Sequence, residues 1–191
     1  MNITAVTMIG LMATAAYGKS NDRSGTPKVT VCMELIPTWH LTIIGQAQEI
    51  ASRMFASADV TINWRRESGH CPAQGIEVSI SKRTPEELKP GALAYALPYE
   101  GAHVQLFYDR IVETSGPALL PSLLAHVLVH EITHILQGNS RHSAQGIMKA
   151  RWELGDYLQM RSKPLAFAGE DIALIREGLA FRAKRGMIAG R

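Results

Sequence analysis

The chain has 191 residues, of which 46% are hydrophobic and 19% charged, a balance typical of a globular protein that builds one hydrophobic core. The formal net charge is +3, but the Lys and Arg residues are scattered, and no dense basic run alternates with aromatic residues. This pattern argues against a nucleic-acid-binding groove. The most basic stretch, with Arg176, Arg182, Lys184 and Arg185, is expected to be the polar face of a closing helix.

The N-terminal residues are uncharged and apolar. Residues 1–16 contain no Lys, Arg, Asp or Glu and end in the small residues Ala13-Thr14-Ala15-Ala16, which is typical of an export signal with its cleavage site. The apolar run is shorter than the ~20 residues that span a bilayer. We therefore expect an export signal at 1–17, a linker at 18–27 and one domain at 28–191. The mature protein is expected to be secreted or periplasmic, without stable membrane association.

The sequence contains two cysteines, Cys32 and Cys71. An even pair in an exported chain favours a disulfide. Neither lies in a Cys-x-x-Cys pair, which argues against a role as metal ligands.

The first half of the domain alternates between strand and helix patterns. Residues 28–36 predict a strand that ends at Pro37, and Thr38 is a candidate N-cap for a helix that continues to about Ala58. Further strands are predicted at 60–66, 75–82 and 103–112, and a short edge strand at 91–97 before Pro98. The predicted class is α+β, with the first helix crossing over the sheet and most of the remaining strands pairing in succession.

The second half is mainly helical. A helix is predicted from Pro117 or Pro121 to Gln137, with leucines and valines on one side and His126, His130 and His134 on the other. Gly138 is its expected C-cap. An irregular segment follows, and a last helix is predicted from Asp171 to about Arg185.

The central helix carries the sequence His130-Glu131-Ile132-Thr133-His134. Residues four apart lie on one helical face, so both imidazoles can reach one zinc ion, and Glu131 lies close enough to take a proton from a metal-bound water. Zinc lowers the pKa of that water toward ~7 and polarises a scissile carbonyl. The alternative is that both histidines are solvated on the polar face of an ordinary helix.

A third imidazole follows shortly after the helix. A chain that turns back at Gly138 brings His142 to the metal, and three protein ligands with a fourth position left to water are typical of a catalytic zinc site. Glu153 is the competing third ligand, because some zinc peptidases use a downstream glutamate. His126 is interpreted as a supporting residue or a wall of the cleft, and not as a ligand.

These residues resemble the metzincin metallopeptidases, and the matrixins within them, whose zinc motif is H-E-x-x-H-x-x-G-x-x-H followed by a methionine turn. His142-Ser143 is similar to the matrixin His-Ser pair, Gly146-Ile147-Met148 to the methionine turn, and 167–175 to the start of the closing helix. The spacing departs from the motif, with one extra residue before Gly138 and one between Gly138 and His142. A divergent branch is therefore expected.

The resemblance implies a fold and a substrate site. The fold would be a twisted, mostly parallel sheet of about five strands with one crossover helix, an active-site helix and a C-terminal helix. Met148 would form an apolar floor under the ligands. Substrate would lie extended along the edge strand formed by Ala92, Leu93, Ala94, Tyr95 and Ala96.

The expected function is that of a zinc-dependent endopeptidase that hydrolyses peptide bonds through a metal-bound water activated by Glu131. The alternatives are a zinc hydrolase of a non-peptide amide and a zinc-binding module without turnover. Tyr95, Tyr99 and Tyr157 are candidates to stabilise the oxyanion, and the sequence selects none of them. The expected partner is a peptide or protein substrate, bound by a monomer.

Overall fold

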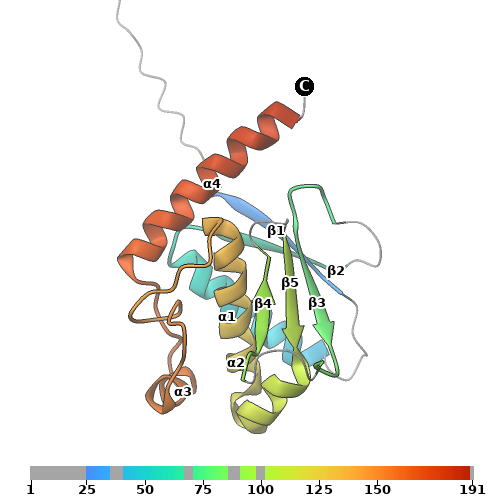
Figure 1. Ribbon diagram of the computed structural model, residues 1–191, viewed down its shortest axis with the longest axis vertical. Coiled ribbons are helices and arrows are strands. Elements are labelled where there is room, and N and C mark those ends of the chain that lie inside the picture. Colours follow the sequence, from blue (N-terminus) through green and yellow to red (C-terminus); the bar gives the residue numbers. More distant parts are fainter. Residues whose placement is uncertain (1–24, 35–40, 67–70, 86–90, 98–101, 190–191) are drawn as a thin grey trace, which may run out of the picture.

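The computed structural model describes residues 25–34, 41–66, 71–85, 91–97 and 102–189 (Figure 1). In these residues one sheet has five strands: β1 (Lys28–Met33), β2 (Thr61–Arg66), β3 (Ile76–Ser81), β4 (Ala94–Ala96) and β5 (His103–Phe107). Their spatial order is β2-β1-β3-β5-β4. All neighbours are parallel except β4, which pairs antiparallel with β5 at one edge. The predicted mostly parallel sheet is confirmed.

Four helices are described: α1 (Leu41–Ala56), α2 (Tyr108–Gln137), α3 (Leu154–Met160) and α4 (Gly169–Ala189). Helix α1 connects parallel strands β1 and β2, as the crossover prediction required. It packs against α2, which also contacts β3, β4 and β5, so one core lies between these helices and the sheet. Helix α3 was not predicted. Helix α4 contacts α2, and its C-terminal end projects beyond the sheet (Figure 1).

The prediction of a strand at 103–112 is wrong beyond Phe107. The chain turns helical at Tyr108, where the Asp109 carboxylate accepts hydrogen bonds from the N–H (2.7 Å) and hydroxyl (2.6 Å) of Thr84. Tyr108 and Ile111, at helical spacing, are the buried residues of this turn. A short apolar run can fit both the two-residue period of a strand and the 3.6-residue period of a helix, so the sequence alone does not decide between them.

Helix α2 consists of two helical segments joined at a kink. Gly116 has φ 61° and ψ 172°, a conformation that a residue with a side chain rarely adopts, and it separates the first segment from the one that carries the histidines. Pro117 follows as the first residue of that second segment, where its missing N–H is not needed. The predicted start near Pro117 therefore agrees with the second segment.

Both sides of the second segment are covered. His126 is fully buried, and His130, Glu131 and His134 are exposed by only 9%, 9% and 6%. The interpretation of these histidines as residues of a solvated polar face is therefore wrong. Among the described residues α2 has the length and composition to cross a membrane. However, 78% of its most apolar 18-residue stretch is buried inside the protein.

A disulfide joins Cys32 in β1 to Cys71, with 5.8 Å between their Cα atoms. The predicted pairing is confirmed. The expected export signal, most of the linker and the proposed N-cap Thr38 lie outside the described residues.

Candidate metal centre

Two ring nitrogens of α2 face one another. The Nε2 atoms of His130 and His134 are 3.1 Å apart, as expected for residues one helical turn apart. The Nδ1 of His130 lies 2.9 Å from the carbonyl oxygen of Ile147, and that of His134 lies 3.1 Å from the carbonyl of Asn139. A carbonyl oxygen only accepts, so each Nδ1 carries the hydrogen and each Nε2 presents a lone pair. Two lone pairs that converge in this way suit a shared cation.

The third histidine comes from the loop after α2. Gly138 ends the helix in the left-handed conformation (φ 67°), and its N–H donates to the carbonyl of His134 at 2.9 Å. The chain then reverses and brings His142 back, so that ligand atoms of the three histidines lie within 4.8 Å of one another. His142 is the exposed member of this group. The structure thus brings together the three histidines named from the sequence.

Burial keeps the imidazoles neutral at physiological pH. It lowers the pKa of His130 and of His134 to about 4, with a smaller contribution from the neighbouring histidines. The pKa of His142 is also lowered by burial. Neutral imidazole is the form that binds a metal ion, so the group is ready for a ligand role at pH 7.

Glu131 lies next to His130 in the sequence and is equally buried. Burial raises the pKa of its carboxyl group to about 7. A carboxyl group with that pKa can take up a proton and give it back near neutral pH, which a general base must do.

The segment after His142 contains buried residues and holds the histidine loop in place. Ile147 and Met148 have no exposed surface, and the N–H of Ser143 donates to the carbonyl of Met148 at 2.8 Å. Gly146 has φ 73°, and a Cβ there would collide with the carbonyl oxygen of Ala166. Met148 therefore lies in the core and is joined by its backbone to the histidine loop, whereas the apolar floor that it would form under the ligands stays a prediction.

Both neighbours of His142 are tied to the start of α4. The Ser143 hydroxyl donates to the buried carboxylate of Asp171 at 2.5 Å, and the N–H of Ala168 donates to the same carboxylate at 3.1 Å. On the exposed side, Arg141 pairs with Glu170 at 2.6 Å. The fold of the loop thus depends on a helix residue 28 positions further along the chain, a tie that the sequence pattern did not reveal.

Trp152 is a second residue that the sequence analysis missed. Its indole Nε1–H donates at 3.2 Å to the Ile147 carbonyl that also accepts from His130, and its ring meets the His130 ring edge-on with 5.6 Å between centroids. It therefore fixes both the ring of His130 and its hydrogen-bond acceptor. No sequence signal marked it, because a Trp four residues after a buried Met is equally typical of ordinary core packing.

His126 has a structural role away from the cluster. Its Nδ1 donates to the Ser122 carbonyl at 2.7 Å, and its Nε2 accepts from the N–H of Leu165 at 3.0 Å, so both ring nitrogens are occupied. Burial lowers its pKa to about 4. These two hydrogen bonds fasten the segment before α4 to α2, and neither of them reaches a histidine of the cluster.

The remaining candidates are dispersed. Glu153 is the N-cap of α3, its N–H donates to the Asp156 carboxylate at 2.7 Å, and it is not part of the histidine group. Tyr95 is 40% exposed on β4, Tyr157 lies on α3, and Tyr99 is outside the described residues. Of the predicted edge segment, Ala94, Tyr95 and Ala96 form β4, and Ala92 and Leu93 precede it.

Comparison with known proteins supports the fold. No protein-family model and no curated protein matches the sequence. The structure is similar to archaemetzincin from Methanopyrus kandleri, with a TM-score of 0.53 and 15% sequence identity over 84% of this chain and 99% of that one. A likeness to myroilysin has a TM-score of 0.37 and 15% identity over 78% and 66%, which is too low to establish a common fold. The chain has a metzincin-like fold, and its three clustered histidines form a candidate metal centre.

Proposed function

We propose that this protein is a zinc-dependent endopeptidase, with His130, His134 and His142 as ligands and Glu131 as general base. The observation that carries the proposal is the convergence of three neutral imidazoles, together with the burial of Glu131, the residue after His130, whose carboxyl pKa is raised to about 7. Three imidazole nitrogens with a free fourth position are a donor set that suits catalytic zinc. When bound, zinc would supply Lewis-acid polarisation of the scissile carbonyl and lower the pKa of water.

The residues of this chain account for the other requirements of peptide hydrolysis. The carbonyls of Ile147 and Asn139 orient the two helical imidazoles, which keeps their Nε2 atoms toward the centre. The Glu131 carboxylate takes the proton of the attacking water and passes it to the leaving amine. Strand β4 lies at the edge of the sheet, so an extended peptide can pair with its outer side.

Glu131 also separates this proposal from a zinc-binding module without turnover. A purely structural site closes its fourth position with another ligand and has no use for a buried acid beside the metal. Extracytoplasmic action, in a secreted or periplasmic protein, is part of the proposal, because a disulfide persists in oxidising compartments.

The decisive variant is Glu131→Gln, which keeps the shape of the side chain and removes the base. We expect it to retain zinc and to lose activity on casein by ~10²–10⁴-fold, the usual contribution of a general base. Glu153→Gln is the matched control, since this glutamate lies outside the cluster and should keep wild-type activity. Wild-type turnover by Glu131→Gln would refute the proposal, as would zinc binding without cleavage of any peptide in a library.

A further inference from the structure

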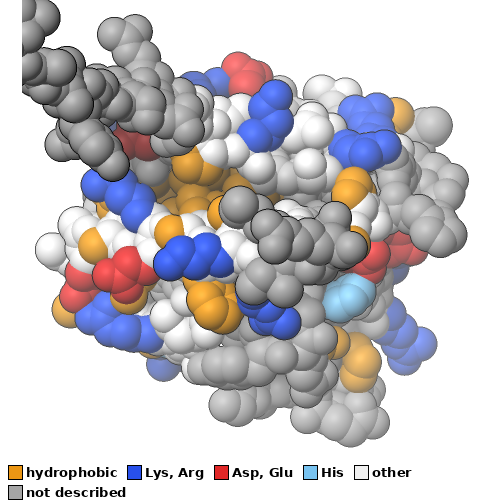
Figure 2. Space-filling model, turned by 90° about the horizontal axis from the view of Figure 1, so that it is seen from above, with side chains coloured by type: hydrophobic (Ala, Val, Ile, Leu, Met, Phe, Trp, Pro, Cys, Tyr) orange, Lys and Arg blue, Asp and Glu red, His pale blue; other side chains and the backbone are white. Residues whose placement is uncertain are grey.

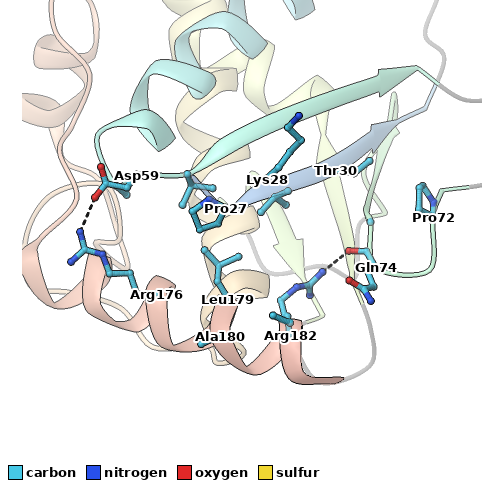
Figure 3. A pocket seen from close by; sticks show the side chains of 15 residues that line it. Pro27, Lys28, Thr30, Asp59, Pro72, Gln74, Arg176, Leu179, Ala180 and Arg182 are labelled. Atoms are coloured by element: carbon cyan, nitrogen blue, oxygen red, sulfur yellow. Dashed lines mark hydrogen bonds and ion pairs between the residues drawn. The ribbon is translucent and has the colours of Figure 1, made fainter. Parts of the chain in front are cut away.

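A groove lies between the second half of α4 and the sheet, away from the histidines. Its walls are the start of β1, the turn before β2, the loop before β3 and α4 (Figure 3). Among the described helices and strands α4 closely approaches only α2, so its second half stands off the sheet and leaves an open groove of about 560 Å³. None of the residues that line the groove belongs to the metal centre.

The inner surface of the groove is aliphatic. Val29, Ala58 and Val60 are core residues with at most 5% of their surface exposed, and Leu179 points from α4 toward Pro27 (Figure 3). No aromatic residue is among the described residues that line it. Seen from the end of the molecule to which α4 projects, hydrophobic side chains form the bottom of a hollow with Lys and Arg side chains at its borders (Figure 2).

The two arginines of the groove have different partners. Arg176 pairs with the Asp59 carboxylate at 2.8 Å on the open side. Arg182 reaches across the groove from α4, and its Nη2 donates to the backbone carbonyl of Gln74 at 2.7 Å (Figure 3). No carboxylate of the described residues lies within ion-pair distance of Arg182, although burial is sufficient to lower its pKa. The Arg182 guanidinium is partly buried, and an anion in the groove would give it the counter-charge that the described residues do not supply.

The volume and lining define the class of ligand. Cavities of ~300–1,000 Å³ are the usual size of small-molecule sites, and an aliphatic lining favours a saturated chain. We propose that the groove binds a small amphiphilic carboxylate of the fatty-acid type, with its alkyl chain against Val29, Val60 and Leu179 and its carboxylate on Arg182. The pairing matches a planar carboxylate with the planar guanidinium fork.

The test is calorimetric titration of octanoate into the full-length, zinc-loaded protein. We expect saturable binding of one octanoate per chain, and binding of 1-octanol at least ~10-fold weaker, because a hydrogen bond to a charged group contributes about this factor or more. Arg182→Gln should weaken octanoate binding by the same factor. Arg185→Gln is the matched control: it removes the same charge from the same helix at an exposed residue that stacks on Phe181, and should leave binding unchanged.

A second variant guards against a folding defect. Ala183→Glu places a carboxylate in the groove at an exposed helical position and should abolish octanoate binding while the thermal unfolding temperature stays near that of the wild type. A metal-site variant, His142→Ala, should bind octanoate as the wild type does.

Three results would overturn the proposal. Equal binding of octanol and octanoate would remove the role of Arg182. Loss of octanoate binding in His142→Ala, but not in Arg182→Gln, would place the probe at the metal centre. Tighter binding of an acetylated Ala-Val-Leu peptide with a free C-terminus, if Ala183→Glu abolishes that binding and His142→Ala does not, would make a peptide chain the occupant. None of these results bears on peptidase activity, so this proposal and the proposed function can fail separately.

Discussion

The three histidines of the metal centre come from two unlike regions. His130 and His134 lie on a helix buried on both sides, and a backbone carbonyl fixes the Nδ1 of each ring. His142 lies on an exposed loop, and its place depends on the left-handed turn at Gly138 and on ties to α4. The helix itself positions two of the candidate ligands, whereas the position of the third depends on contacts between the loop and α4. Each prediction below tests one side of this contrast.

The largest expected effect is loss of metal when the loop ligand is removed. His142→Ala should be recovered largely without zinc after dialysis, because losing a ligand weakens binding beyond the ~10–100-fold typical of supporting residues. Glu153→Ala should retain close to one zinc per chain, since Glu153 caps α3. Zinc content by atomic absorption measures both. The opposite pattern would make Glu153 the third ligand.

The next effect concerns the buried helix at low pH. Burial lowers the pKa of His126 from 6.5 to about 4, so between these values the unfolded chain binds a proton that the folded chain does not. The contribution of this residue to the free energy of unfolding should therefore be fully present above pH 6.5. It should fall by on the order of 3 kcal/mol as the pH drops to 4.

Urea unfolding of the metal-free protein at several pH values measures this contribution. His126→Gln should unfold more easily at pH 7 and show a shallower loss of stability between pH 6.5 and 4. A slope identical to that of the wild type would mean that His126 is not neutral in the folded protein.

A smaller effect is expected at Trp152, which supports the helical side of the centre. Trp152→Phe keeps an aromatic ring beside His130 but removes the donor to the Ile147 carbonyl. We expect zinc affinity, measured by competition with a chelator, to fall by about 10-fold. The absorption spectrum of the cobalt-substituted protein should shift as well. An unchanged spectrum and affinity would reduce Trp152 to a packing residue.

The smallest effect is expected at Arg141, next to the loop ligand. Its pair with Glu170 is exposed, and exposed pairs contribute little. Arg141→Ala should leave the melting temperature and zinc content unchanged, whereas Ser143→Ala, which breaks the buried tie to Asp171, should lower both. Equal losses in the two variants would show that the buried Ser143–Asp171 hydrogen bond contributes no more than the exposed Arg141–Glu170 pair.

The same contrast explains how far the sequence could predict this molecule. The period of apolar residues predicted the strands, α1 and the histidine segment of α2, whereas the mostly parallel arrangement of the sheet was implied by the family resemblance. The pattern did not separate strand from helix at Tyr108, and it did not reveal α3, whose Leu154 and Leu158 are largely exposed. The export signal, the domain bounds and the monomeric state stay predictions.

The site divides in the same way. The spacing of His130, Glu131 and His134 is local and can be read on a helix, and Gly138 indicated the turn to His142. The contacts of Asp171 and Trp152 join segments whose distance along the chain is unrelated to their distance in space. Such contacts leave no periodic signal in one sequence.

The disulfide has a consequence for the assembly of the protein. Cys32 and Cys71 bracket the whole crossover unit of α1 and β2, so the bond closes this unit into a covalent ring of about forty residues. In the chain-entropy model a ring of that size raises the free energy of the unfolded state by about 4 kcal/mol. Both ends of the crossover are also held together while the bond is intact. The unit therefore cannot open as a hinged arm and exchange with that of a second molecule, a route by which folds with long connections form domain-swapped dimers.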